Sequence, residues 1–115
     1  MTNRSGRLGA SAETAVVAYL VANGFPEAER RVTNGPKDRG DIGGIAHFVG
    51  EVKNEKVINL PQYLRELAVE MENADADFGA CIVKRRGANV KDWYFVLSLE
   101  QGVAWMRYIL KGEHR

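Results

Sequence analysis

The spacing of hydrophobic residues predicts three helices in this chain. Across residues 8–23 the apolar positions recur every three or four residues, as they do on one face of a helix. Pro61 suits the first turn of a second helix over residues 61–73, because proline is tolerated where no intrahelical N–H bond is needed. A further apolar pattern predicts a third helix over residues 98–110.

Runs of β-branched, aromatic and other apolar residues predict the strands of one sheet, at residues 29–33, 41–46, 48–53, 79–84 and 93–97. The second and third strands adjoin and are expected to form a hairpin, whereas the Asn-Gly-Pro segment before them predicts a loop over residues 34–40. The chain is therefore predicted to form a single domain over residues 1–115. Its expected fold class is an α/β sandwich with a central mixed five-stranded sheet flanked by helices.

Composition restricts the chain to an ordinary globular protein. Of its 115 residues 45% are hydrophobic and 27% charged, which excludes disordered and fibrous classes. The single cysteine, Cys81, cannot form an intrachain disulfide, and its apolar neighbours predict a core thiol in a reducing cytoplasm. No stretch approaches the ~18 apolar residues of a membrane span, so no membrane partner is expected. The chain also lacks a His/Cys cluster, so any metal must be held by oxygen.

The net charge of +1 conceals a separation of charge along the chain. Residues 84–91 contain four basic and no acidic side chains, whereas residues 66–77 contain five acidic and no basic ones. We therefore expect an acidic exposed side on the second helix and a basic surface that faces nucleic-acid phosphates. The alternative for each run is a simply solvated face.

The strand that ends at Lys53 carries the strongest chemical signal. Because strand residues alternate between faces, Glu51 and Lys53 share one face and Val52 points to the other. Asp41 opens the neighbouring strand, and antiparallel pairing would bring its carboxylate beside Glu51. Such a group suits Mg²⁺, which prefers hard oxygen ligands. The alternative is a surface salt bridge between strands, which contributes about 0.2–1 kcal/mol.

Glu13 is a carboxylate on the apolar stripe of the first helix. It shares this stripe with Val16, Val17 and Leu20, which are expected to face the sheet. A role in the same site is one interpretation of its position. The other is a glutamate in the first turn, where the helix dipole favours negative charge.

Four features form a set: Glu13, the Arg30-Arg31 pair, the Gly40-Asp41-Ile42 segment and the Glu51-Val52-Lys53 segment. With this set the chain resembles the PD-(D/E)XK nuclease superfamily over roughly residues 6–97. Within it the chain is most similar to the small Holliday junction resolvases of archaea and bacteriophages. The resemblance implies a restriction-endonuclease-like fold and Mg²⁺-dependent hydrolysis of phosphodiester bonds, with Mn²⁺ able to substitute. Gly40 stands where the superfamily name has proline.

The resemblance also implies roles for individual residues. Asp41 and Glu51 would be Mg²⁺ ligands together with the backbone carbonyl of Val52. Lys53 would orient or help to activate the attacking water, and Glu13 would lie in or just outside the metal shell, which gives the catalytic set Glu13, Asp41, Glu51 and Lys53. The expected DNA contacts are Arg7, Arg30, Arg31, Asn34, Lys37, Arg39, Lys56, Lys84, Arg85 and Arg86.

The third helix offers a possible interface. Ser98 and Gln101 have the spacing of a capping box, in which each side chain bonds a backbone N–H of the other. The expected core face comprises Leu99, Val103, Met106 and Leu110, and the apolar residues outside it are Trp105, Tyr108 and Ile109. These outer residues suggest a homodimer, although Trp105 capping the core of the monomer is the alternative.

The leading prediction is a structure-selective DNA endonuclease of recombination, namely a Holliday junction resolvase that acts as a homodimer in the cytoplasm, or in the host cytoplasm if it is phage-encoded. A four-way junction is close to two-fold symmetric, so paired active sites match it. One alternative is an endonuclease of the same fold that cuts flaps, forks or duplex DNA. The other is an inactive DNA-binding module.

Overall fold

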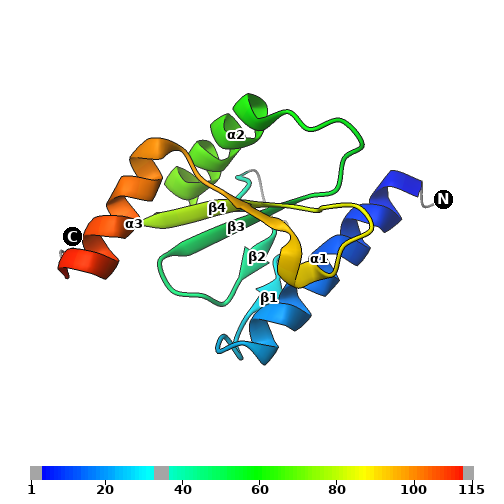
Figure 1. Cartoon of the computed structure of the whole chain (residues 1–115), viewed down its shortest axis with the longest axis horizontal. Helices are drawn as coiled ribbons and strands as arrows, with labels where there is room; N and C mark the ends of the chain where they lie inside the picture. The colour runs from blue at the N-terminus through cyan, green and yellow to red at the C-terminus, as the bar shows by residue number, and fades with distance from the viewer. Residues whose placement is uncertain (1–3, 33–36, 113–115) are drawn as a thin grey trace.

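The computed structural model describes residues 4–32 and 37–112, with side chains from residue 10 onward. Its elements, in chain order, are α1 (Arg4–Ala22), β1 (Glu29–Arg30), β2 (Ile42–Gly43), β3 (Phe48–Lys53), α2 (Leu60–Asn73), β4 (Phe78–Val83), the 3₁₀ turn η1 (Val90–Asp92), β5 (Tyr94–Val96) and α3 (Leu99–Lys111). The five strands form one sheet in the order β1-β2-β3-β4-β5 (Figure 1). The predicted five-stranded sheet is therefore confirmed.

The sheet is mixed because of how its middle strands are connected. β3 and β4 pair in parallel, which requires a crossover, and α2 provides it. β1, β2 and β5 add antiparallel strands on the two sides of this unit. The predicted hairpin is also confirmed, since Ile42 of β2 lies opposite Gly50 of β3.

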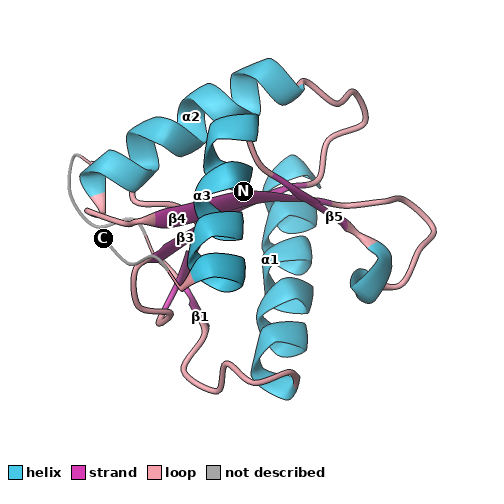
Figure 2. Ribbon diagram, turned by 60° about the vertical axis from the view of Figure 1, so that its left-hand side comes forward, coloured by secondary structure: helices cyan, strands magenta, loops and turns pink. Residues whose placement is uncertain are grey.

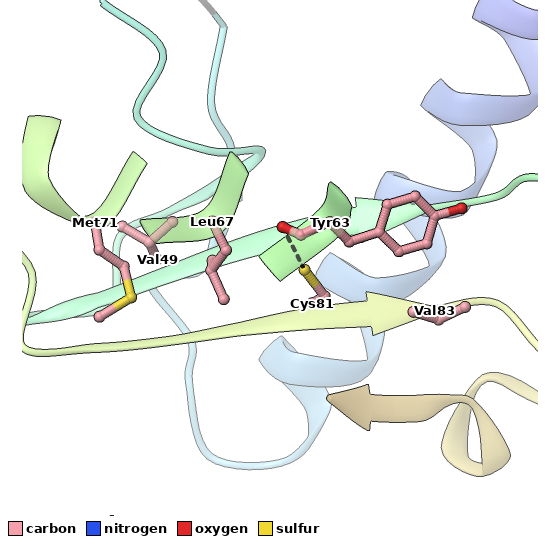
Figure 3. Packing of buried hydrophobic residues seen from close by; sticks show 6 residues of the cluster. All are labelled: Val49, Tyr63, Leu67, Met71, Cys81 and Val83. Atoms are coloured by element: carbon pink, nitrogen blue, oxygen red, sulfur yellow. Dashed lines mark hydrogen bonds between the residues drawn. The ribbon is translucent and has the colours of Figure 1, made fainter. Parts of the chain in front are cut away.

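Two hydrophobic clusters fill the two faces of the sheet. On the α2 face, Val49 and Cys81 pack beneath the helix, and the buried Cys81 confirms the predicted core thiol (Figure 3). The buried residues of this cluster are Val49, Tyr63, Leu67, Met71, Cys81 and Val83. On the α1 face, the buried residues are Ala12, Val16, Ile42, Val52 and Ile82. Val49 and Val52 thus lie on opposite faces, as the alternation along β3 predicts.

The helix termini follow the polar residues of the sequence, with one exception. Asn59 accepts a hydrogen bond from the backbone of Gln62 at 3.3 Å and so caps α2, with Pro61 in the first turn. Ser98 Oγ accepts from the backbone N–H of Gln101 at 3.1 Å. The second half of the predicted capping box is wrong, because Gln101 Oε1 is buried and has no hydrogen-bond partner in the described part of the chain. Among the described helices, none combines the length and apolarity needed to cross a membrane.

The predicted core face of α3 is wrong for all its residues except the half-buried Val103. Leu99 is 84% exposed, and Met106 and Leu110 are exposed as well. Instead α3 lies against β4 (Figure 2) and packs through Trp105. The Trp105 ring lies 5.4 Å from the ring of Phe78 at the start of β4. Trp105 also contacts Phe48 and Phe95, and Tyr108 contacts Phe78. The helix contacts these strands through its aromatic rings, so the aliphatic stripe is left facing outward.

Gly40 occupies a position that excludes other residues. Its φ is +90°, in the left-handed region, and an added Cβ would lie 2.6 Å from Val49 Cγ1 and 3.1 Å from the carbonyl oxygen of Gly50. A proline, whose φ is fixed near −65°, could not adopt this backbone. This explains why glycine precedes Asp41 here.

We predict that Gly40→Ala destabilises the protein by about 2–4 kcal/mol, because it adds a steric clash to the strain of a positive φ. Gly87→Ala is the matched control, since Gly87 has φ +78° with open space around it and is expected to lose only about 1–2 kcal/mol. Urea unfolding measures both. Equal losses would show that the contact with Val49 is unimportant.

Candidate functional site

Glu51 is a buried carboxylate on an inner strand. β3 lies between β2 and β4, and α2 covers this face, so Glu51 is only 8% exposed. Lys53 Nζ lies 3.6 Å from Glu51 Oε1, and both side chains are largely buried. The interpretation of this pair as a surface salt bridge is therefore wrong, because β3 is an inner strand and not an edge of the sheet.

Three carboxylates converge at this point: an oxygen of Asp38, one of Glu51 and one of Glu70 lie within 4.8 Å of one another. Glu70 comes from α2 and is 3% exposed. Glu51 Oε2 and Glu70 Oε1 are buried without a hydrogen-bond partner in the described residues. Buried polar atoms are normally paired, so this geometry requires a proton or a cation between the carboxylates.

The prediction that the acidic side of the second helix is exposed is wrong for Glu70. Glu70 follows Tyr63 by seven residues and Leu67 by three, so it lies on the buried stripe of α2. This spacing was the available signal in the sequence. Asp38 gave no comparable signal, because it belongs to a loop whose path depends on tertiary contacts.

Burial and mutual repulsion raise the pKa values of these carboxyl groups. For Glu51 the principal cause is desolvation, followed by the negative charge of Asp41. Desolvation also raises the pKa of Glu70, to about 7, and the nearby Asp38 adds to this effect. Desolvation raises the pKa of Asp41 as well, although a hydrogen bond from Val52 opposes it. The site therefore resists carrying its full negative charge unless a positive ion is present.

Asp41 is held at the edge of this cluster by the sheet. Its backbone N–H donates to the Gly50 carbonyl at 2.9 Å, and its carbonyl accepts from Arg31 N–H at 2.7 Å. Its Oδ2 accepts the N–H of Val52 at 2.8 Å. The structure thus places Asp41 near Glu51, as the hairpin predicts, but outside the group of three carboxylates found among the described residues.

Lys53 lies between two carboxylates. Its Nζ donates to Glu66 Oε1 at 2.8 Å, and it lies 5.0 Å from the centre of the Tyr63 ring. Burial opposes the charge of Lys53, but the hydrogen bond to Glu66 and the charge of Glu51 outweigh it and raise the pKa of Lys53. Lys53 therefore remains an ammonium ion, which can orient an oxygen atom but cannot accept a proton.

Glu13 lies near Asp41 but comes from α1, the helix on the other face of the sheet. α1 begins at Arg4, so the interpretation of Glu13 as a first-turn residue is wrong. Its Oε1 accepts a hydrogen bond from Arg30 Nε at 3.1 Å, and its charge contributes to the raised pKa of Asp41. Glu13 is thus near Asp41 and is already paired with a basic residue.

Asp38 is fixed over the cluster by two hydrogen bonds. Gly40 N–H donates to Asp38 Oδ1 at 2.9 Å, and Asn73 Nδ2 donates to the Asp38 carbonyl at 2.8 Å. The second bond ties the loop to the C-terminal end of α2. The resulting hollow has a volume of about 340 Å³ and is lined by Asp38, Glu51, Lys53, Glu66, Val69 and Glu70.

The basic residues expected to contact DNA differ in their surroundings. Arg30 pairs with Glu13, and Arg31 donates to the carbonyl of Arg39 at 2.8 Å. Lys84 lies 5.5 Å from the centre of the Trp93 ring. The exposed members are Arg30, Lys37, Arg39, Lys56, Arg85 and Arg86. Asn34 and the side chain of Arg7 lie outside the description that the structure gives.

Comparison of the chain with protein-family models, curated proteins and solved structures finds no match. The chemistry of the site itself is therefore the basis for its assignment. Carboxylate oxygens are the ligands that Mg²⁺, Mn²⁺ and Ca²⁺ prefer, and unpartnered buried oxygens of Glu51 and Glu70 line the hollow. The donor set fits a divalent cation.

In metal-free buffer we predict that the free energy of unfolding falls as the pH rises from 4.5 to about 7. The first value is the ordinary pKa of a glutamate, and the second is the raised pKa of Glu70 in the folded protein. The raised pKa means that the folded state binds more protons than the unfolded state, so deprotonation favours unfolding. Urea unfolding across this range measures the slope.

Glu70→Gln should reduce this pH dependence, because glutamine does not ionise, while the raised pKa values of Glu51 and Asp41 preserve the remainder. Glu72→Gln, at an exposed position on the same helix, should leave it unchanged. The same slope in both variants would show that Glu70 does not carry the effect.

Proposed function

We propose that this protein is a Mg²⁺-dependent, structure-selective DNA endonuclease with a restriction-endonuclease-like fold, and specifically a Holliday junction resolvase. The observation that carries the proposal is the buried Glu51 on β3, which has an unpartnered oxygen and lies 3.6 Å from the ammonium of Lys53. Metal-dependent hydrolysis of a phosphodiester bond uses cation ligands together with a positive hydrogen-bond donor, and this pair of residues would supply both.

The contacts of each site residue indicate the role that it would have in hydrolysis. Glu51 and Asp41 would hold the cation with the Val52 carbonyl, and Mg²⁺, or Mn²⁺ in its place, would polarise the phosphate and lower the pKa of bound water. The Val52 N–H fixes the Asp41 carboxylate in place. Lys53, kept cationic by Glu66 and Glu51, would orient the attacking water or a phosphate oxygen, and Glu13 would act from the adjoining helix.

The positions of the basic loops support DNA as the substrate. β3 and β4 run in parallel, so the segments that follow them leave the sheet at the same edge. Lys56 follows β3, and Arg85 and Arg86 follow β4, all of them exposed. Lys53 is at this end of β3, so these cations adjoin the candidate site and can neutralise the phosphates of a bound strand.

The outward stripe of α3 supports a homodimer. Leu99, Met106, Ile109 and Leu110 are exposed apolar side chains on one helix. A C₂ dimer would cover this surface and match the near two-fold symmetry of a four-way junction. The free, buried thiol of Cys81 is in keeping with a protein of the cytoplasm, or of the host cytoplasm if it is phage-encoded.

Asp41→Asn and Glu51→Gln are each predicted to reduce cleavage of a labelled four-way junction at least about 100-fold while leaving junction binding intact, because only the charge of one ligand is removed. Cleavage is followed on gels with Mg²⁺, and binding by gel shift without it. Glu72→Gln serves as the exposed acidic control. Undiminished cutting by the variants would show that the site lies elsewhere.

The choice of substrate is tested separately on matched four-way junctions, flaps and linear duplexes. We expect the wild type to cut the junction fastest, in symmetrically paired strands, because a dimer presents two sites. Equal rates on all three substrates would show that the protein is not a resolvase, whereas the proposal that it is an endonuclease would stand. The absence of any product with Mg²⁺ or Mn²⁺ would instead favour an inactive DNA-binding module.

Replacement of both Arg85 and Arg86 by alanine is predicted to weaken DNA binding and to reduce the slope of log K against log salt by about 2, since each phosphate contact contributes about 0.9. Fluorescence anisotropy at several salt concentrations measures this slope. Lys111→Ala is the control, because Lys111 ends α3, which packs at the opposite end of β4. An unchanged slope in the double variant would exclude this loop from the DNA surface.

A further inference from the structure

The carboxylate group beneath α2 contains two residues that the Asp41 and Glu51-x-Lys53 pattern does not include. Asp38 comes from the loop before β2, and Glu70 comes from the last turns of α2. Both place an oxygen within 4.8 Å of Glu51 and of each other. They come from segments separated by more than thirty positions in the sequence, so only the fold brings them together.

We propose that Asp38 and Glu70 are ligands of the divalent cation held by Glu51, so that α2 and the loop contribute directly to the metal site. This inference rests on the proposed function for its biological purpose, but the binding of the metal can be tested without any cleavage assay.

The unpartnered oxygens support this assignment beyond the clustering of acids. Glu70 is 97% buried, since only 3% of its surface is exposed, and its Oε1 has no hydrogen-bond partner in the part of the chain that the structure describes. Glu51 Oε2 is also buried and has no hydrogen-bond partner among the described residues, and both glutamates line the same hollow. Two buried acceptors that face one space are costly unless a shared proton or a cation lies between them, and a cation can do this when both groups are ionised.

The ammonium of Lys53, which lines the hollow, does not neutralise these two oxygens. Among the described residues that line it, Lys53 is the one basic side chain, and its closest carboxylate contact is with Glu66 at 2.8 Å. It reaches Glu51 through Oε1 at 3.6 Å, which leaves Oε2 free. A divalent ion coordinated by oxygen therefore matches the remaining charge and donors, and Asp38, exposed on the rim, would complete its coordination from the solvent side.

The hydrogen bonds around Asp38 indicate that the loop is positioned for this contact. Asn73, three residues after Glu70 on α2, holds the carbonyl of Asp38, and Gly40 N–H holds its Oδ1. One helix thus supplies a ligand and also fixes the loop that carries another.

The experiment measures Mn²⁺ binding by the loss of the free-ion signal in electron paramagnetic resonance, with wild type, Glu70→Gln, Asp38→Asn and Glu72→Gln. We expect the first two variants to bind Mn²⁺ at least about 10-fold more weakly than wild type, because each loses a charged ligand, and Glu72→Gln to bind normally. Asp38→Asn retains an oxygen that can accept from Gly40, so it tests the proposal even if Glu70→Gln does not fold.

The outcomes separate this inference from the proposed function. Unchanged Mn²⁺ affinity in both variants, or no Mn²⁺ binding by wild type, would overturn the inference. If wild type cuts junctions while both variants bind Mn²⁺ normally, the endonuclease proposal survives and these ligands are wrong. If the variants lose Mn²⁺ binding but wild type cuts no DNA, the metal site is supported and the endonuclease proposal fails.

Discussion

The burial of the Glu51 carboxylate on β3 is the constraint on which the surrounding structure depends. β3 is flanked by β2 and β4 and covered by α2, so Glu51 cannot reach bulk water as an edge residue would. A carboxylate in this position must be neutralised, and the structure surrounds it with Lys53 on one side and Glu70 on the other. Lys53 relieves the negative charge of Glu51 whereas Glu70 adds to it, and the proposed metal site rests on this combination.

α2 connects the core to the site. Its apolar residues, including Tyr63 and Leu67, pack on β3 and β4, and the same buried stripe continues into Glu70. Glu66, one turn earlier, holds the ammonium of Lys53, and Asn73 holds the loop that carries Asp38. A shift of this helix would therefore disturb packing, the position of Lys53 and the carboxylate group together, so stability and site geometry are coupled through one element.

Much of the fold follows from local patterns. The apolar spacing predicts the helices within a few residues, and the alternation along β3 places Val49 and Val52 on opposite faces. The mixed sheet and its hairpin follow from the order of the elements. The buried face of α3 does not follow from the local pattern, because this helix carries apolar residues on more than one side. Its orientation is decided by the aromatic contacts of Trp105 with Phe78 and Phe95. Periodicity cannot choose between two apolar sides of a helix.

The sequence by itself determined which residues share a strand or a stripe: Glu51 with Lys53, Asp41 at the start of the hairpin, and Glu13 on the inner side of α1. Only the tertiary structure decided that Asp38 and Glu70 join Glu51, that Glu66 binds Lys53, and that Arg30 binds Glu13. The physical reason is that side-chain direction within a helix or strand is fixed by local backbone geometry. Which elements face one another depends instead on how α2 packs across the parallel strands and how the loop before β2 is anchored to it.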